Sequence, residues 1–442
     1  MNFYKSLYLT DRFFYFLGGT VFVFFVSFLI QPFFYVALAL LVLCAILIGL
    51  EVFSLYKKTN ITISRTIQPI FSLSDKNKVS LLLKNESAII LKIKIIDEIP
   101  YQFNERDFLI VTTIEKEKSE TINYYLEPTI RGEYLFGNIN VFIRTRLGLI
   151  AKKETTESAR SVAVYPSIIQ MKQQELIALN HPSFTQGENK VRKIGRSYEF
   201  DQIKQYVPGD DTRNINWKAT STQNELMVNH YEDERSQQIY SIIDKSRVMK
   251  TPFNGLTLVD YAINASLAFS NIVLKKEDKA GIISFSKKVD TSLKADKGNR
   301  HLKKIMYALY KEKYDYQEAN YEALYYTIRR SISNRSLLFL YTNFDSLYAL
   351  ERNIPILRMI NRYHLLVVVF FENTELEEYS QKKSKTVLDI YQQTIAKKFI
   401  LEKNQIIKEL NKHGIQAIKS TPEGLSANTI NKYLDLKSTG VI

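Results

Sequence analysis

Residues 13–50 read FFYFLGGTVFVFFVSFLIQPFFYVALALLVLCAILIGL, and this stretch contains no charged residue. As a single helix it would be about 57 Å long, nearly twice the thickness of the hydrocarbon core of a bilayer. Gln31-Pro32 lies in its middle, where proline removes a backbone donor and disfavours helix in the residue before it. The sequence therefore predicts two membrane spans, about residues 13–30 and 33–55, joined by a tight turn.

The charges that flank this apolar pair predict its orientation. Lys5 and Arg12 precede it and Lys57-Lys58 follow it, while the connecting turn is uncharged. The positive-inside rule then places both ends of the pair, and everything after residue 58, in the cytoplasm. A signal peptide is disfavoured, because a second apolar span follows the first and no small-residue cleavage site does. We expect a multi-pass protein of the cytoplasmic membrane that contacts lipid through residues 13–55.

The overall charge and the cysteine count exclude several classes of site. A net charge of +14 favours an acidic partner, either a membrane surface or nucleic acid. The basic residues are scattered, however, and the aromatic residues do not alternate with a basic strip as in a single-strand binder, so we expect no nucleic-acid partner. The only cysteine, Cys44, lies within the apolar run, which excludes disulfides within the chain and zinc sites built from cysteines.

The next part of the chain, residues 59–170, has the pattern of a β domain. Short runs rich in β-branched and aromatic residues are separated by Asn, Asp, Gly or Pro. Strands at this spacing, without helices between them, predict a β-sandwich of immunoglobulin-like type. The expected strands are residues 61–65, 79–84, 89–96, 108–113, 121–126, 132–136, 139–144 and 161–165.

From residue 237 the pattern changes to alternating strands and helices. This alternation predicts a doubly wound, mostly parallel sheet over residues 237–442. Between the two domains, residues 171–236 read as a linker, with a polar loop at about 173–196 followed by a charge-dense segment. The expected strands are residues 238–244, 280–285, 289–293, 336–341, 364–371 and 415–418. The expected helices are residues 256–274, 301–311, 321–332, 386–411 and 427–436.

Catalytic patterns are absent from the sequence. The five histidines are far apart, and the chain has neither a Gly-x-x-x-x-Gly-Lys loop nor a Gly-x-Ser-x-Gly elbow. A carboxylate pair could form among Glu199, Asp201, Asp210 and Asp211. Interleaved basic residues such as Arg213 favour salt bridges instead. We therefore expect no catalytic residues and a protein that is not an enzyme.

The end of the first strand in the α/β domain resembles the start of a von Willebrand factor A domain. Such domains hold Mg²⁺ with an Asp-x-Ser-x-Ser loop, a threonine from a second loop and an aspartate from a third. Here Asp244 and Ser246 match, but Val248 replaces the second serine and Asn343 occupies the expected aspartate position. We expect no cofactor. The alternative is a Mg²⁺ ion held by Asp244 and Ser246, and the structural interpretation is a strand-end acid that caps a helix or binds a nearby lysine.

The charge-dense segment resembles the signature of the bacterial DUF58 family. The wider layout is also similar, with an N-terminal transmembrane hairpin, a β-rich region and an A-domain-like α/β module. The resemblance therefore covers nearly the whole chain and implies a bacterial inner-membrane protein. The matching residues are Gly195, Glu199, Phe200, Tyr206, Pro208, Gly209, Asp210, Asp211, Arg213, Ile215, Trp217, Lys218 and Ala219.

The resemblance also implies a function. Family members are similar to proteins encoded beside MoxR-type AAA+ ATPases and are thought to act with them as membrane-bound partners. We therefore expect a membrane-anchored cytoplasmic interaction module or adaptor, acting with such an ATPase in envelope or complex-assembly processes. The alternatives are a metal-dependent ligand-binding A-type domain and an envelope-biosynthesis enzyme that depends on Asp210, Asp211 or Arg213.

For the signature segment itself we predict a structural role. Asp210 or Asp211 should cap backbone amides in a turn or pair with Arg213. Ile215 and Trp217 should alternate inward on a short extended segment, with Trp217 as an apolar anchor. Because the segment lies between the two domains, we expect it to clasp one against the other. The alternative is that its residues form a docking surface for a partner.

Overall fold

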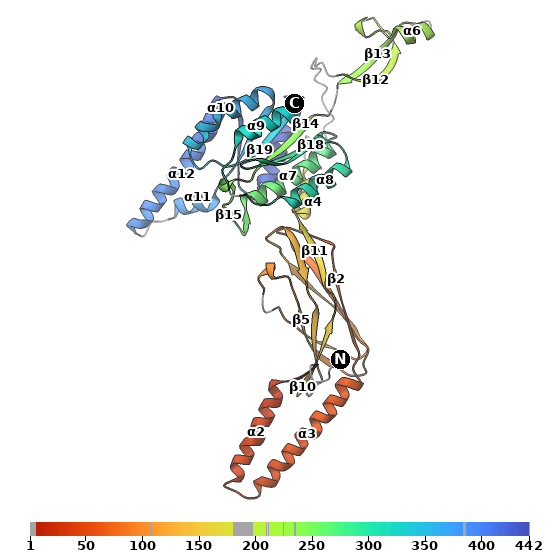
Figure 1. The fold of residues 1–442 in the computed structure, drawn as a ribbon, viewed down its shortest axis with the longest axis vertical. Coiled ribbons are helices and arrows are strands. Elements are labelled where there is room, and N and C mark those ends of the chain that lie inside the picture. Colours follow the sequence, from red (N-terminus) through yellow and green to blue (C-terminus); the bar gives the residue numbers. More distant parts are fainter. Residues whose placement is uncertain are drawn as a thin grey trace. The chain divides into compact units, whose positions relative to one another are not determined.

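The computed structural model describes residues 6–105, 108–179, 198–208, 210, 212–223, 225–233, 236–315, 317–382 and 386–441. The chain forms two compact units, Met1–Tyr165 and Pro166–Ile442 (Figure 1). The first contains the apolar helices and a sheet-rich β domain, and the second contains the α/β region. Each unit is described by itself below.

Two apolar helices open the first unit, α2 (Asp11–Ser27) and α3 (Phe33–Lys57). The chain leaves the helical conformation between them, close to Pro32, as predicted. The helices pack against each other, with the rings of Phe24 and Phe34 6.1 Å apart. Among the residues that the structure describes, α3 is the one helix long and apolar enough to cross a membrane. Many large apolar side chains of both helices are exposed.

The β domain of this unit contains all eight strands that the sequence predicts for it. They form three sheets, with strand orders β1-β10-β9-β5-β6, β2-β4-β7 and β3-β11-β8. Strands β1, β3 and β10 were not predicted, because two of them are only three residues long and β10 is rich in charged residues. The bounds are β1 (Leu7–Leu9), β2 (Ile61–Ile67), β3 (Ile70–Ser72), β4 (Asn77–Asn85), β5 (Leu91–Asp97), β6 (Ile110–Ile114), β7 (Ser119–Leu126), β8 (Gly132–Phe136), β9 (Ile139–Arg144), β10 (Ile150–Thr156) and β11 (Arg160–Tyr165).

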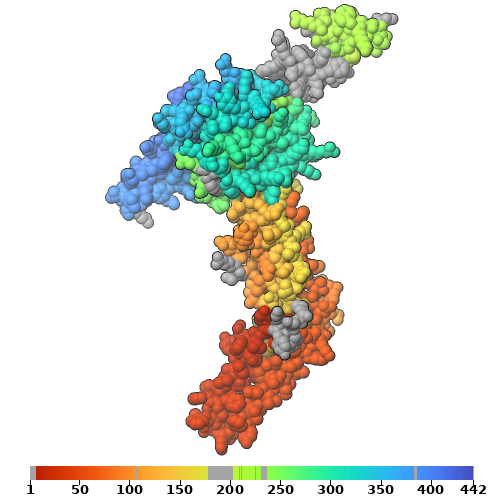
Figure 2. Space-filling view, viewed as in Figure 1, coloured from red at the N-terminus to blue at the C-terminus, as the bar shows by residue number. Residues whose placement is uncertain are grey.

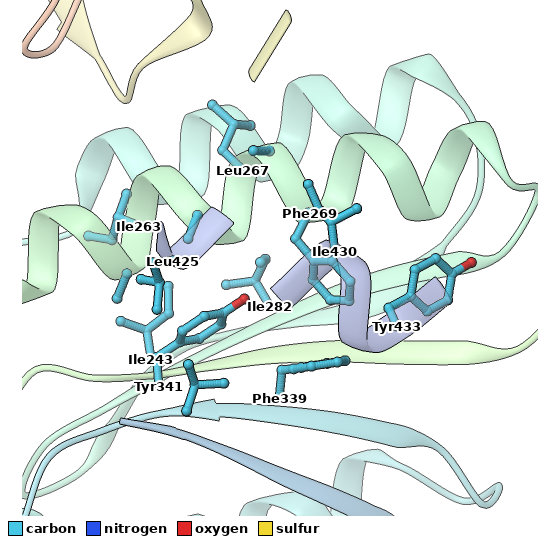
Figure 3. Close-up of a cluster of buried hydrophobic side chains, with 14 of the residues drawn as sticks. Ile243, Ile263, Leu267, Phe269, Ile282, Phe339, Tyr341, Leu425, Ile430 and Tyr433 are labelled. Atoms are coloured by element: carbon cyan, nitrogen blue, oxygen red, sulfur yellow. The ribbon is translucent and has the colours of Figure 1, made fainter. Parts of the chain in front are cut away.

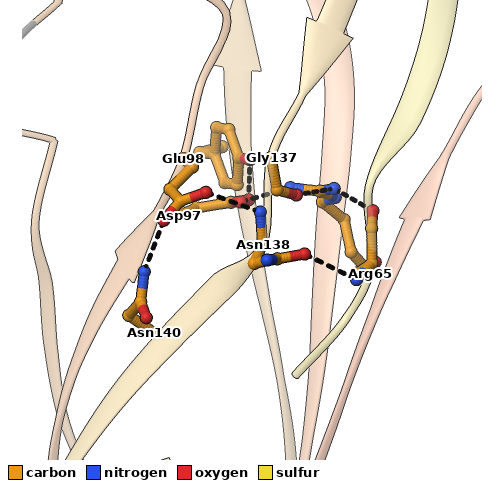
Figure 4. A network of polar contacts seen from close by, with 8 residues as sticks. Arg65, Asp97, Glu98, Gly137, Asn138 and Asn140 are labelled. Carbon is orange, nitrogen blue, oxygen red and sulfur yellow. Dashed lines mark hydrogen bonds and ion pairs between the residues drawn. The ribbon is translucent and has the colours of Figure 1, made fainter. Parts of the chain in front are cut away.

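A buried ion pair crosses the interior of the β domain (Figure 4). The Arg65 guanidinium on β2 pairs with the Asp97 carboxylate on β5 and donates to the carbonyl oxygen of Gly137 at 2.8 Å. The Tyr124 hydroxyl on β7 donates to the other oxygen of Asp97 at 2.5 Å. Burial raises the pKa of Asp97, while the Tyr124 hydrogen bond and the charge of Arg65 oppose the rise. The network therefore satisfies a buried charge and links strands from two different sheets.

The helices are held on the β domain by one turn, residues 145–149. Glu51 of α3 is 2% exposed, and its carboxylate accepts hydrogen bonds from the amides of Gly148 at 2.7 Å and Leu149 at 2.9 Å. On the other side of the turn, the Thr10 hydroxyl donates to the carbonyl oxygen of Gly148 at 2.6 Å. The Arg12 guanidinium donates to the carbonyl oxygen of Leu147 at 2.8 Å. Both apolar helices thus bind the same turn of the β domain.

The α/β unit contains a six-stranded sheet of order β18-β17-β14-β19-β20-β21. All neighbouring strands are parallel except β18, which is antiparallel to β17. Numbered from β14, this order is 3-2-1-4-5-6, that of a doubly wound sheet, which confirms the sequence prediction. The strands are β14 (Gln238–Asp244), β17 (Lys279–Phe285), β18 (Val289–Asp296), β19 (Leu337–Tyr341), β20 (Leu365–Phe371) and β21 (Gln416–Ser420).

Helices cover both faces of this sheet. On one face α7, α8 and α13 enclose a core. In it the Phe269 ring of α7 makes edge-to-face contacts with Phe339 of β19 and Tyr433 of α13, with ring centroids 4.7 and 5.6 Å apart (Figure 3). On the other face α9, α10 and α12 enclose a second core. The helices are α4 (Ile168–Leu179), α7 (Leu258–Lys275), α8 (Asn299–Lys311), α9 (Tyr321–Ser331), α10 (Leu347–Tyr363), α11 (Thr374–Gln381), α12 (Val387–Lys412) and α13 (Leu425–Ser438).

Three of these helices were not predicted. The loop prediction is wrong for residues 173–179, because they belong to α4; the Ser167 hydroxyl caps that helix and Met171 packs into the core. Helix α10 contains Pro355, which disfavours helix in a sequence pattern. Helix α11 is only eight residues long. The rest of the predicted loop, residues 180–196, lies outside the described residues.

Candidate functional site

The strand order reverses between β14 and its neighbours β17 and β19, and ligands of doubly wound sheets bind beyond the carboxyl ends of strands at such a point. Asp244 is the last residue of β14, and Thr342 directly follows β19. Because these two strands are parallel neighbours, both residues lie at the same edge of the sheet. This edge is the first candidate site.

Asp244 is fully buried and connects the two loops. One of its oxygens accepts a hydrogen bond from the backbone amide of Ser246 at 2.8 Å, and the other accepts from the Thr342 hydroxyl at 2.6 Å. The Tyr321 hydroxyl lies 2.9 Å from the Thr342 hydroxyl. Burial raises the pKa of Asp244, and the hydrogen bonds from Thr342 and Ser246 oppose the rise. Asp244 thus accepts a hydrogen bond from the amide of Ser246, the residue before the short helix η3 (Arg247–Met249), whose own side chain makes no cap hydrogen bond.

The adjacent lysine, Lys245, is buried and pairs elsewhere. Its ammonium nitrogen lies 2.6 Å from Glu312 and 2.8 Å from Asp290. Burial favours the neutral form of Lys245, but the hydrogen bonds and charges of these two carboxylates outweigh that effect and raise its pKa. Glu312 also accepts a hydrogen bond from the Ser284 hydroxyl at 2.7 Å. The two carboxylates therefore keep Lys245 charged, and the resulting ion pairs have a structural role at the end of β14.

A second lysine approaches the same edge from helix α12. The Lys403 ammonium donates to the side-chain oxygen of Asn343 and to the carbonyl oxygen of Phe344, the latter at 2.6 Å. Burial lowers the pKa of Lys403 to about 8, and the charges of Asp345 and Glu402 oppose the change. Asn343, where the resemblance expects an aspartate ligand, thus binds an ammonium. Lys403 is 60 residues away in sequence, so no local pattern could have predicted this contact.

The oxygen atoms at this edge of the sheet do not form a suitable ligand set for an octahedral Mg²⁺ ion. Mg²⁺ requires near-ideal octahedral oxygen coordination, usually with carboxylates. The described residues offer the buried Ser246 hydroxyl, which has no hydrogen-bond partner among them, and the Asp244 carboxylate, whose two oxygens already accept hydrogen bonds. The Lys403 charge beside Asn343 would repel a second cation. Within the described part of the chain, no cluster of three or more His, Cys, Asp or Glu could hold a metal.

A cavity of about 460 Å³ lies beside this edge, where β19, β20 and β21 end. Its walls come from the turn between β14 and α7, from the strand ends, and from helices α11 and α12. Most of the lining is apolar, and Lys403 and Asn343 are among its polar groups. The apolar lining residues include Phe253, Leu258, Phe371, Leu376 and Phe399.

The signature segment forms its own two-stranded antiparallel sheet, β12 (Tyr198–Gln205) and β13 (Met227–Asp233). Between the strands lie η2 (Thr212–Asn214) and α6 (Trp217–Gln223), and α6 is labelled in Figure 1. Glu199 and Phe200 are on β12, the amide of Tyr206 donates to the Leu226 carbonyl at 2.7 Å, and Arg213 lies on η2. Gly209 and Asp211 lie outside the described residues.

The predicted turn around Asp210 is present. Its carboxylate accepts a hydrogen bond from the Val207 amide at 3.1 Å, and the Asp210 amide donates to the Val207 carbonyl at 2.9 Å. The carboxylate also pairs with the Lys204 ammonium at 3.0 Å. The prediction that Asp210 caps a backbone amide is therefore confirmed.

The prediction for Trp217 is wrong. Trp217 begins helix α6 and is 70% exposed, whereas we expected it on an extended segment facing inward. The physical reason is a helix cap, because the Asn216 side chain accepts a hydrogen bond from the Ala219 amide at 3.0 Å and starts the helix. Ile215 is half-buried, and its backbone forms an isolated antiparallel bridge with Val228 of β13.

A comparison with known families matches one region of the chain. Residues 202–377, from the signature segment to α11, match the family described as "Protein of unknown function DUF58". The chain therefore contains a DUF58 region. Uncharacterized protein YeaD from Bacillus subtilis (strain 168) is 25% identical over 190 residues, which are 43% of this chain. The match spans only 45% of the length of that relative.

Two solved structures from Bacteroides are also similar. An aerotolerance-related membrane protein from Bacteroides fragilis, solved with multiple mutations to serines, is 11% identical to this chain, with a TM-score of 0.29. The match covers 45% of this chain and 99% of that one. The conserved hypothetical protein BatB from Bacteroides thetaiotaomicron is 12% identical with a TM-score of 0.32, covering 46% of this chain and 100% of that one.

Proposed function

We propose that this DUF58-containing chain is a membrane-anchored adaptor that recruits a MoxR-type AAA+ ATPase to the cytoplasmic face of the bacterial inner membrane. Its role in this proposal is binding and not catalysis. The ATPase partner comes from the family resemblance, and the strand order together with Asp244 supports an A-type fold for the recruiting unit. The observation that carries the interaction half of the proposal is an exposed apolar surface on helix α12.

This surface is the first half of α12. Seven apolar side chains in this half of the helix are between 39% and 84% exposed. They lie within 15 residues, which is about 22 Å of helix length. Figures 1 and 2 show that this part of α12 projects, with α11, from the body of its unit. Contiguous exposed apolar residues of this extent mark interaction sites on soluble domains. They are Val387, Leu388, Ile390, Tyr391, Ile395, Phe399 and Leu401.

The charges around this surface favour a protein partner. Exposed Lys397 and Lys398 lie among the apolar residues, and the neighbouring helix α11 carries exposed Glu375 and Glu378. An apolar centre bordered by charges of both signs is the usual composition of a protein–protein interface. An anionic lipid surface would instead be matched by basic residues alone.

For the anchor we propose that α2 and α3 both span the bilayer, with both ends in the cytoplasm. At 17 residues α2 is about 26 Å long, and the part of α3 before Glu51 is about 27 Å long, so each just reaches across the hydrocarbon core. The buried Glu51 then lies outside the lipid, where its partners in the β domain satisfy its charge. Arg12 and Lys57 are at the same end of the pair, in accord with the positive-inside rule.

The adaptor proposal is tested by purifying the tagged full-length chain from membranes with ATP, with ADP and without nucleotide, in several detergents. Mass spectrometry should identify a MoxR-type ATPase with the wild type. The double variant Leu388→Ser/Tyr391→Ser should lose it, because it removes two exposed apolar contacts of α12. The matched control is Tyr348→Ser on α10, which also removes an 80% exposed tyrosine and should retain the ATPase. Failure to recover the ATPase in every condition, or its retention by the double variant, contradicts the proposal.

A further inference from the structure

The cavity beside the strand ends shares only Phe399 with the exposed apolar surface of α12, and it does not depend on an ATPase partner. Its volume, about 460 Å³, is within the range of small-ligand sites. It lies where doubly wound sheets bind their ligands, beyond the carboxyl ends of parallel strands. Its apolar walls come from four different parts of the α/β unit, and a few polar groups converge on it. These are the features of a binding site for an apolar ligand with one polar end.

Lys403 supplies the strongest of these polar groups. Its ammonium has three protons, and the described residues accept two of them, at the Asn343 side chain and the Phe344 carbonyl. Both acceptors are neutral, so no carboxylate among the hydrogen-bond partners neutralises this mostly buried charge. Because Lys403 lines the cavity, its remaining proton is available to a ligand there. A ligand anion would gain a charge-assisted hydrogen bond in a largely apolar environment.

Two of the three acids that line the cavity have ion-pair partners of their own. The Glu372 carboxylate pairs with the Lys419 ammonium, and the Asp345 carboxylate lies 3.9 Å from the Arg247 guanidinium. Glu377 is the remaining lining acid, and it belongs to the rim formed by α11. Of the two lysines in the lining, Lys419 thus pairs with a carboxylate, whereas Lys403 donates its hydrogen bonds to neutral groups.

We propose that this cavity binds a carboxylate attached to an apolar group, and that Lys403 recognises the carboxylate without a metal ion. The apolar group packs between the walls that Phe253 and Phe399 contribute. Two sources supply this chemistry, the free C-terminus of a polypeptide with an apolar last residue and a small aromatic or aliphatic acid. The Lys403 ammonium would bind the carboxylate as a metal ion does at the strand ends of other domains. This agrees with the hydrogen bond that the ammonium donates to Asn343, at the expected position of a metal ligand.

The test uses the full-length chain in lipid nanodiscs with EDTA present throughout. Binding of N-acetyl-Leu-Phe is compared with that of its C-terminal amide, and binding of 4-phenylbutyrate with that of its amide, by isothermal titration calorimetry. At least one acid should bind tenfold or more tightly than its amide, the factor that one charge-assisted hydrogen bond supplies. A preference for the peptide acid identifies a polypeptide C-terminus as the source, and a preference for 4-phenylbutyrate identifies a small acid.

Lys403→Met should abolish the difference between acid and amide while keeping the side-chain volume similar. Lys397→Met is the matched control, an exposed lysine on the same helix, and should keep the difference. Leu376→Trp, which fills the cavity, should weaken acid and amide alike and serves as a second variant should Lys403→Met fail to fold. Equal binding of acids and amides, no binding of either acid at millimolar concentration, or an acid preference that survives Lys403→Met overturns the proposal.

Discussion

Replacing Glu51 by glutamine tests how the apolar helices are held on the β domain. In the wild type, one carboxylate oxygen accepts from the Thr145 hydroxyl and the Gly148 amide, and the other accepts from the amides of Leu149 and Ile150 at 2.9 and 3.1 Å. Glutamine keeps one acceptor oxygen and replaces the other with a donor. At least one pair of buried donors therefore loses its acceptor.

The cost follows from those two donors. A buried donor left without a partner costs about 1–3 kcal/mol, so Glu51→Gln should destabilise the turn by about 2–6 kcal/mol. Since 1.36 kcal/mol corresponds to a factor of ten, the amides of residues 148–150 should exchange with deuterium at least about thirtyfold faster. The measurement is hydrogen–deuterium exchange by mass spectrometry on the full-length chain in nanodiscs.

Glu133→Gln is the control, because Glu133 is an exposed acid on β8 of the same unit. It should leave the exchange of residues 148–150 unchanged. If Glu51→Gln also leaves their exchange within threefold of the wild type, then Glu51 does not hold the turn. The contacts of Thr10 and Arg12 with its carbonyl groups would then have to account for the joint alone.

Three further predictions concern separate parts of the chain. The folded-state pKa of Lys403, about 8, is below its unfolded value. Between about pH 8 and 10.5 the unfolded chain therefore binds more protons than the folded chain, and stability should rise with pH over this range. Lys403→Met should remove this slope, worth up to about 3 kcal/mol, in thermal unfolding followed by circular dichroism. In a Cys44→Ala background, the variant Tyr101→Cys, which changes an exposed site, should react with a membrane-impermeant maleimide only after cells are permeabilised. Labelling of intact cells would contradict the cytoplasmic orientation. Trp217→Ala should change stability by less than about 0.5 kcal/mol, because the side chain is exposed; a loss above 2 kcal/mol would instead support the clasp.

The sequence predicted most elements of the fold because their patterns are long and strongly periodic. The buried strands β14 and β20 and helices α7 and α12 are near their predicted positions, and the break at Pro32 separates the apolar helices. Prediction failed where a local signal was weak or contradictory. Strand β10 has few apolar residues, and Pro355 obscures α10.

The candidate site was predictable only in its local part. The position of Asp244 at the end of β14 followed from one buried strand, and the Asp210 turn followed from a short pattern. The helix at Trp217 could have been recognised, since Asn216 is a favourable cap residue. The contact of Lys403 with Asn343 could not, because it joins a helix and a loop 60 residues apart. A contact of that kind depends on how the helix packs against the sheet, and no local pattern in a single sequence predicts that packing.

Helix α12 contributes to both proposals, and this has a thermodynamic consequence. Its inner side carries Lys403, which binds the loop after β19, and its outer side carries the exposed apolar residues that include Tyr391. Phe399 belongs to both, since it lines the cavity and is 46% exposed. A carboxylate in the cavity and a partner on the outer surface would therefore contact the same helix. If either ligand changes the position of α12, linkage requires each to alter the affinity of the other by the same factor. In that case, carboxylate binding in the cavity would regulate the adaptor without a metal ion.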